Sequence, residues 1–168
     1  MAKTSLTDIR GLADPLFSYA FDLIIPNCPG GGSSRGLTIK VMTTSIPGMS
    51  LDDVTVTLKG IDIKFAGRQM FTHTLEATYL ETRDMTTHDA ITNWIRLARD
   101  VRTNTGSNKA AYSTTANLVL YDDANNVVRT YVLDGFFPQT IGDAALDSSS
   151  SAPVTMSVTF AYDTWTKS

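Results

Sequence analysis

Residues 67–101 read GRQMFTHTLEATYLETRDMTTHDAITNWIRLARDV and contain the pattern of a strand followed directly by the pattern of a helix. Apolar and polar side chains alternate between residues 69 and 80, which is the period of a β-strand with one buried face. The period then becomes helical over residues 87–101, where the apolar side chains are Ile91, Trp94, Ile95 and Ala98. Thr86 and Asp89 have the spacing of a capping box, with aspartate in place of glutamate. We expect this apolar helix face to pack on a sheet, because one helix cannot bury it alone.

The remainder of the chain supplies that sheet. Alternation predicts further strands at residues 16–25, 37–44, 54–58, 61–65, 116–121, 127–133 and 154–162. The first two look like a hairpin with a glycine-rich tip, and residues 122–126 are a strong hairpin turn. Pro138 is expected to end its ribbon, because proline cannot donate to a central ladder. The predicted fold is mainly β: an antiparallel barrel or sandwich of about eight strands with one flanking α-helix.

Residues 47–67 hold two short alternating runs around Lys59-Gly60, a plausible two-residue hairpin turn. This segment is either an ordinary excursion of the chain from the domain or a protruding β-arm. The two runs alternate regularly and few residues connect them, which favours the β-arm. Residues 1–14 read as an N-terminal arm of the single domain 1–168. We expect the β-arm to contact other subunits through Asp52, Asp53, Val54, Val56, Leu58, Lys59, Ile61, Ile63 and Phe65.

Composition narrows the function classes. Charged residues make up only 18% of the 168-residue chain, and Thr and Ser fill the polar strand positions. Either β-propensity or a sheet face covered by a partner accounts for these hydroxyl residues. A net charge of −3 argues against a general nucleic-acid binder. No apolar run reaches the roughly 18 residues that cross a bilayer, so we expect no stable membrane association.

Candidates for metal binding are weak. His73 shares a strand face with apolar residues and is expected at the edge of the core. A site could be drawn from His88, Asp89 and Asp84, but adjacent helical residues point to different faces. The only cysteine, Cys28, cannot form an internal disulfide and is expected to be a free thiol in a reducing cytoplasm.

Candidates for catalysis and phosphate binding are equally weak. No serine lies in a Gly-x-Ser-x-Gly elbow. The glycine run 30–32 lacks the Lys-Ser/Thr ending of a phosphate loop and is expected to connect to a strand. Glu76 with Glu81, or Asp62 with Asp84, are pairs that any β domain offers by chance. We therefore predict no catalytic, cofactor or metal residues, and no enzyme.

Several short motifs follow in order along the C-terminal two-thirds of the chain. They are Gly67-Arg68-Gln69-Met70-Phe71, His88-Asp89-Ala90, Trp94, Leu133-Asp134-Gly135-Phe136-Phe137-Pro138, Leu146-Asp147-Ser148 and Phe160-Ala161-Tyr162-Asp163-Thr164-Trp165. In this order and spacing the chain resembles the tail tube proteins of contractile-tailed bacteriophages, which are related in fold to the type VI secretion tube protein. Ile46-Pro47-Gly48 also fits, the first 40 residues match only in outline, and Phe137 departs where tryptophan is expected.

The resemblance implies a structural virion protein. Six copies would close into a ring through intersubunit sheet pairing, and the rings would stack head-to-tail into a hollow tube inside a contractile sheath. The implied partners are further copies, the tail sheath, baseplate, tail terminator and tape measure proteins. The implied location is the phage tail, assembled in the host cytoplasm, and no cofactor is implied.

If the chain forms such a tube, DNA would pass through it without specific binding. Each lysine or arginine that neutralised a phosphate would slow the passage of the DNA. Lumen positions are then expected to be mainly Thr, Ser, Asn, Asp or Glu. Three alternatives stay open: a tube-like baseplate or tail-end protein, the tube of an injection particle that carries protein, and a β-barrel ligand-binding module or small hydrolase.

Overall fold

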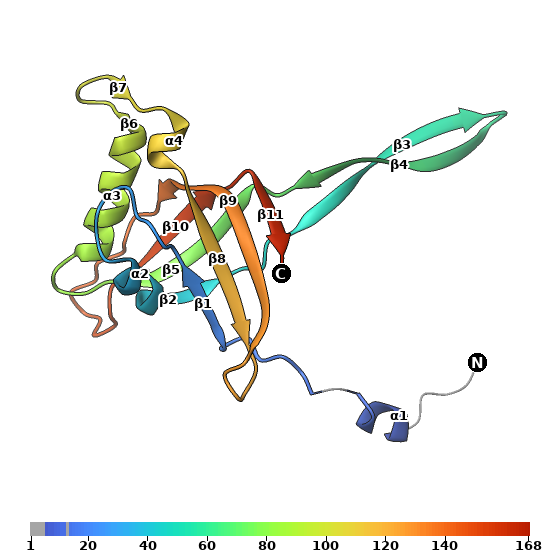
Figure 1. Cartoon of the computed structure of the whole chain (residues 1–168), viewed down its shortest axis with the longest axis horizontal. Coiled ribbons are helices and arrows are strands. Elements are labelled where there is room, and N and C mark those ends of the chain that lie inside the picture. Colours follow the sequence, from blue (N-terminus) through green and yellow to red (C-terminus); the bar gives the residue numbers. More distant parts are fainter. Residues whose placement is uncertain (1–5, 13) are drawn as a thin grey trace.

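Figure 1 shows a computed structural model that describes residues 6–12 and 14–168. The helices are α1 (Leu6–Arg10), α2 (Ser34–Lys40), α3 (Thr86–Ala98) and α4 (Lys109–Tyr112). The strands are β1 (Phe21–Ile24), β2 (Val41–Thr44), β3 (Met49–Leu58), β4 (Ile61–Phe71), β5 (Thr74–Leu80), β6 (Arg99–Asp100), β7 (Thr105–Gly106), β8 (Thr114–Tyr121), β9 (Val127–Ile141), β10 (Thr155–Ala161) and β11 (Thr164–Lys167). Of the expected N-terminal arm, residues 1–5 and 13 lie outside the described residues.

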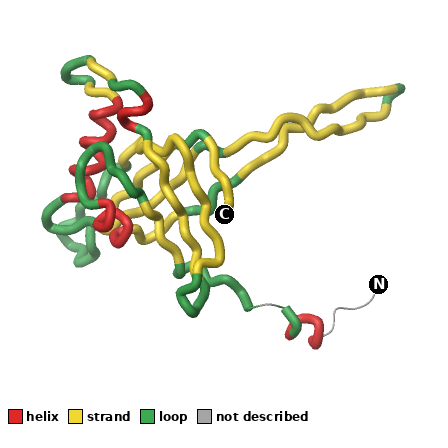
Figure 2. The backbone as a smooth tube through the Cα atoms, in the orientation of Figure 1, coloured by secondary structure: helices red, strands yellow, loops and turns green. Residues whose placement is uncertain are grey.

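A seven-stranded antiparallel sheet in the order β1-β8-β9-β10-β5-β2, with β11 on β9, forms the body of the molecule. The sheet coils because β9 serves both halves: it pairs with β8 and β11 first and with β10 after its bend (Figure 2). Gly135 lies in the bend at φ +68°, and a Cβ there would be 2.1 Å from the Asp163 carboxylate. The prediction of a mainly β, antiparallel barrel-like fold with a flanking helix is confirmed.

The predicted end of the ribbon at Pro138 is wrong, because β9 continues to Ile141. Pro138 lies opposite Phe160, and the register shifts between Thr159 and Phe160, so that Gln139 is an extra residue. A β-bulge tolerates a proline that a regular ladder would exclude. The hairpin around residues 122–126 is confirmed, since β8 pairs directly with β9.

The N-terminal prediction of two hairpin strands is also wrong. Only residues 21–24 of the first expected strand form β1, and β1 pairs with β8. Residues 34–40 form α2, because Ser33 caps it by accepting a hydrogen bond from the Gly36 N–H. The remaining residues form β2, which pairs with β5. β1 and β2 are therefore the two edge strands of the sheet, not neighbours in a hairpin.

The stretch 67–101 contains two further differences. The expected continuous strand is broken where His73 adopts φ +56°, so β4 ends and β5 begins on either side of it. The expected helix 87–101 starts one residue earlier and ends at Ala98, because residues 99–100 pair with β7. The capping box at Thr86 does not form: Met85 is the N-cap, and it makes no side-chain hydrogen bond.

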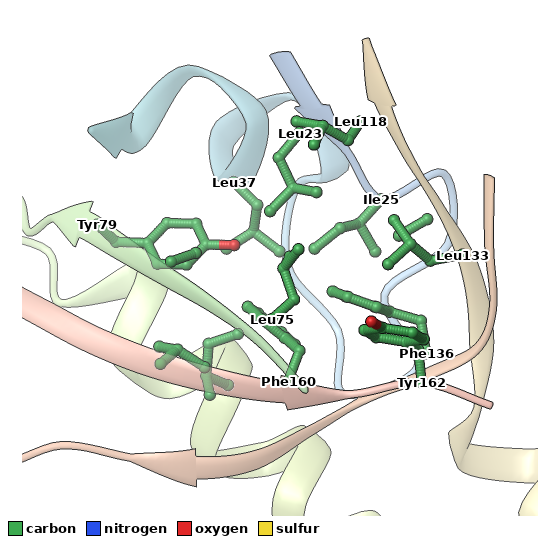
Figure 3. Packing of buried hydrophobic residues seen from close by; sticks show 14 of the residues in the cluster. Leu23, Ile25, Leu37, Leu75, Tyr79, Leu118, Leu133, Phe136, Phe160 and Tyr162 are labelled. Carbon is green, nitrogen blue, oxygen red and sulfur yellow. The ribbon is translucent and has the colours of Figure 1, made fainter. Parts of the chain in front are cut away.

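The core lies between the coiled sheet and the helices (Figure 3). Phe136 stacks on Phe160 with ring centroids 4.5 Å apart, and Tyr79 meets Phe160 edge-on. Trp94 of α3 is fully buried, and its Nε1–H donates to the Tyr112 carbonyl at 2.5 Å. Since α3 packs against β9 and α4, this helix closes one side of the core.

Candidate self-association surface

A two-stranded ribbon of β3 and β4 projects from the barrel (Figure 1). The strands pair antiparallel along their length, with one register shift between Leu51 and Asp53. Lys59 and Gly60 form the connecting turn at φ 52° and 79°, as a type I′ hairpin requires. The predicted hairpin is confirmed, and its strands are longer than the two alternating runs. We call β3, β4 and their turn the β-arm.

One face of the β-arm consists of apolar side chains that contact no core. Three cross-strand pairs form it: Val54–Phe65, Val56–Ile63 and Leu58–Ile61. Their side chains are between 38% and 67% exposed. Exposed apolar area of this kind is unfavourable by about 25 cal/mol per Å² relative to a buried state. A contiguous patch of this sort is typical of an interaction site. We call these residues the apolar arm face.

The opposite face of the β-arm is polar and internally paired. Thr55 lies across from Lys64, and Thr57 lies across from Asp62. Lys64 forms an ion pair with Asp53, and the Thr57 hydroxyl donates to Asp62 at 2.6 Å. This face is suited to water. The two faces of one thin ribbon therefore have opposite solvent preferences.

The structure places the other predicted contact residues around this ribbon. Asp52 lies at the register shift, where a Cβ on Gly67 would approach its carbonyl oxygen to 3.0 Å. Asp53 is on the polar face, and Lys59 is in the turn at the tip. Of the predicted helix residues, Ile91 and Trp94 are fully buried, whereas Ile95 and Ala98 are partly buried.

The residues considered for chemistry do not converge. Among residues 6–12 and 14–168, no group of three His, Cys, Asp or Glu side chains is placed to hold a metal ion. His88 Nδ1 lies 3.7 Å from Asp89, whereas His73 Nδ1 hydrogen-bonds the Tyr162 carbonyl at 3.1 Å. Glu76 is exposed on the outer side of β5, and the Glu81 side chain is buried, so these carboxylates have different environments.

The glycine run serves packing. A Cβ on Gly30 would lie 2.3 Å from the backbone nitrogen of Trp94, so only glycine lets this loop approach α3. The expectation that the run leads into a strand is wrong, since it leads into α2. The adjacent Cys28 packs against the core, and burial raises the pKa of its thiol.

An ion cluster that sequence reasoning missed joins α2 to α3. The Glu81 carboxylate, 3% exposed, accepts backbone hydrogen bonds from Thr82, Thr87 and His88. Lys40 lies 3.9 Å from it and donates to three threonine hydroxyls. Burial acts to raise the pKa of Glu81, but these hydrogen bonds and the charge of Lys40 outweigh burial and lower it. The sequence signal that could have indicated this cluster is Glu81 itself, an acidic residue five positions before the start of α3.

The outer face of the sheet is rich in hydroxyl groups. Cross-strand partners on this face, opposite the core, include Thr78 with Ser157, Glu76 with Thr159, and Thr43 with Thr78. Thr140 of β9 continues the row next to Thr159. We call these residues the hydroxyl face. These residues include one carboxylate, that of Glu76, and no basic side chain, so the electrostatic potential of the hydroxyl face is weakly negative.

No helix in the described part of the chain is long and apolar enough to span a membrane. A comparison with curated protein sequences gives no significant match. Comparison with solved structures does give matches. The three described next are under 25% identical to this chain and show the fold alone.

One match is a chain of the sheath–tube complex of an extracellular contractile injection system in its extended state, with TM-score 0.66, 16% identity, and 99% of both chains covered. A second comes from the sheath/tube terminator of such a system, with TM-score 0.69, 16% identity, and 94% of this chain and 99% of that chain covered. A type six secretion system protein matches with TM-score 0.51, 12% identity, and 88% and 82% covered.

A family comparison covers most of the chain. The phage tail tube protein family matches residues 23–168, which include the β-arm and all of the sheet except the first two residues of β1. This family consists of structural tube proteins, not enzymes. The chain therefore belongs to the phage tail tube protein family.

Proposed function

We propose that this chain is the repeating subunit of a phage tail tube, in which six copies close into a ring and rings stack into a hollow conduit. The observation that carries the proposal is the apolar arm face, which is exposed on the single chain and whose pairs are held in register by a confirmed hairpin. Contact with another copy would remove this face from water. Heterologous contacts of that kind, repeated, give a closed ring when the rotation between copies closes and an open helical polymer when it does not.

The partners follow from the tube role. Structural matches come from a sheath–tube complex, a tube terminator and a baseplate. We propose that the tube formed by this chain is enclosed by a sheath, begins on a baseplate and ends at a terminator, with a tape measure protein inside during assembly. The location is then the tail of the particle, after assembly in the host cytoplasm.

We further assign the wall of the bore to the hydroxyl face. A conduit for DNA needs a surface that neither neutralises phosphates nor exposes apolar groups, and a row of hydroxyl groups with one carboxylate meets both conditions. Replacing Thr78 with lysine in every copy should slow DNA release, because six-fold repetition multiplies each added charge. Unchanged release from particles with Thr78→Lys tubes would remove the assignment.

Negative-stain microscopy of the purified protein tests the proposal. Long tubes with a central channel support a repeating subunit, whereas single rings that do not stack support a terminator or baseplate role. A monomer that remains dispersed at high concentration contradicts both. Particles that carry protein in the bore would identify the injection-particle alternative.

Two neighbouring residues give a matched test of the β-arm. Val56 is on the apolar arm face and Thr55 is on the polar face, across from Lys64. We expect Val56→Glu to abolish tubes, because it places a charge in the contact, and Thr55→Glu to leave them intact. Deletion of residues 52–64 should give a folded subunit that does not polymerise. Tubes formed by the deletion variant would show that the β-arm is not the contact.

A further inference from the structure

A surface hollow lies where the two edge strands of the sheet approach each other. Its volume is about 290 Å³, and residues from the N-terminal segment, β1, β8, the end of β2 and the chain after β2 line it. The apolar lining residues are Leu16, Phe17, Phe21, Ile46, Leu118 and Leu120. We call this hollow the seam furrow. The outer edges of β1 and β2 pair with no strand of the described residues, so the barrel is open at this point.

An acidic rim adjoins the seam furrow. A second hollow of about 330 Å³ shares Leu16 and Phe17 with it and is also lined by Asp14, Asp122 and Asp123. Hydrogen bonds from Asn126 lower the pKa of Asp122, and the Tyr19 hydroxyl donates to Asp123 at 3.1 Å. No basic side chain lines either hollow. An apolar floor therefore ends at a negatively charged border.

The β-arm carries the complementary arrangement. Its apolar arm face ends at the pair Leu58–Ile61, and Lys59 follows at the tip. Among the residues that the structure describes, Lys59 has no ion-pair partner, whereas Lys64 is already paired with Asp53. An apolar surface with a cation at its end matches an apolar furrow with carboxylates at its end, in chemistry and in order.

The β-arm cannot occupy the seam furrow of its own chain. In Figure 1 the tip of the β-arm lies at the upper right, and the β8–β9 turn that carries Asp122 and Asp123 lies at the lower end of the barrel. The occupant must therefore come from a second copy. The N-terminal helix α1 also exposes apolar residues, Leu6 and Ile9, but they are not organised as cross-strand pairs.

We propose that the seam furrow receives the β-arm of a second copy. The apolar arm face packs on the furrow lined by Phe17, Leu118 and Leu120, and the Lys59 ammonium lies against the acidic rim. This inference rests on the proposed function, because it names the surface that the β-arm of a tube subunit contacts. It makes each copy both donor and acceptor, which is the requirement for an unlimited polymer.

Cysteine cross-linking between two preparations tests the proposal. Both carry Cys28→Ser; one adds Leu58→Cys on the β-arm and the other adds Phe17→Cys in the seam furrow. Both positions are about half exposed, so folding tolerates the changes. After mixing and oxidation with copper–phenanthroline, we expect a disulfide dimer of one copy from each preparation. Thr57→Cys, on the polar arm face, is the matched control and should react at least about tenfold more slowly with Phe17→Cys.

A charge exchange adds a second readout. Lys59→Glu should reduce cross-linking between Leu58→Cys and Phe17→Cys about tenfold, and Asp123→Lys in the acceptor should restore it. Tube formation by the Cys28→Ser protein is recorded first by negative-stain microscopy. Tubes without the arm-to-furrow disulfide overturn this inference and leave the proposed function standing. Formation of the disulfide in a protein that forms no tubes supports docking of the β-arm in the seam furrow and contradicts the proposed role as a tube subunit. Faster cross-linking of Phe17→Cys with Ile9→Cys would assign the furrow to α1 and overturn the proposal.

Discussion

Replacing Glu81 with glutamine should destabilise the subunit by about 3 kcal/mol. Glu81 Oε1 accepts from Thr82 and Thr87, and Oε2 accepts from His88 at 2.8 Å. In either orientation of a glutamine amide, its NH₂ group faces a backbone N–H, so a charge-assisted bond of about 1.5–3 kcal/mol is lost. The ion pair with Lys40 at 3.9 Å is lost too. Breaking a buried pair costs about 3–5 kcal/mol, and the retained hydrogen bonds place the result at the lower end.

Urea unfolding at pH 7 followed by the fluorescence of the two tryptophans, Trp94 and Trp165, measures this effect, at concentrations where light scattering shows monomer. For a domain of this size, about 3 kcal/mol lowers Tm by about 6–12 °C. Glu76→Gln is the matched control: this carboxylate is exposed on β5, the strand that ends just before Glu81, and its loss should cost less than about 0.5 kcal/mol. A cost below about 1 kcal/mol for Glu81→Gln would refute the reasoning.

The pH dependence supplies an independent check on the same residue. Because the folded-state pKa of Glu81 is lowered, the unfolded chain takes up the proton first as pH falls. The stabilisation is complete above the unfolded pKa of about 4.3 and is lost as pH falls through the folded value. As the pH falls from 5 through the folded-state pKa of Glu81, the free energy of unfolding of the Glu81→Gln variant should therefore decrease less than that of the parent protein. If the free energy of unfolding of the two proteins fell equally with pH, the lowered pKa of Glu81 would not be the cause of the acid dependence.

Two substitutions and one labelling reaction test the packing around α3. Gly30→Ala should cost more than about 3 kcal/mol in urea unfolding, because its Cβ would lie 2.3 Å from the Trp94 nitrogen, whereas Gly11→Ala meets only ordinary contacts and should be nearly neutral. Trp94→Phe should cost about 2–4 kcal/mol, since it leaves a cavity and the Tyr112 carbonyl without its donor; a cost under about 1 kcal/mol would contradict that contact. Cys28 should react with a disulfide reagent at pH 8 more than about tenfold slower than a free thiol, because burial raises its pKa, and urea should remove the difference; equal rates in folded and unfolded protein would count against burial.

Local signals predicted the elements whose partners are close in sequence. The β-arm needs only alternation and a turn that admits positive φ, and Lys59-Gly60 supplies that turn. The β8–β9 hairpin is local in the same way. The helix α3 is strongly amphipathic over three turns, and its apolar residues were identified, although residues 99–100 of the expected helix form β6.

Elements fixed by distant contacts were predicted poorly. Leu37, Ile39 and Val41 alternate as in a strand, yet residues 34–40 are helical, with only Leu37 buried. Lys40 at the end of that helix is held by threonines more than 40 positions away, which no short window contains. Pro138 was expected to end its ribbon because proline cannot donate, and the bulge that accommodates it depends on the partner strand β10, which is distant in sequence.

The same division applies to the candidate interface. The donor side could be predicted because the apolar arm face is a local pattern, and a two-stranded ribbon is only marginally stable in water without a covering surface. The acceptor side could not be predicted, since the seam furrow is assembled from three separate stretches, residues 16–21, 44–46 and 118–120, and owes its opening to the unpaired edges of β1 and β2. An interface between identical chains needs both halves in one sequence. In this sequence the apolar arm face can be recognised from the alternation of apolar residues. The seam furrow forms only when the strands of the barrel have paired everywhere else.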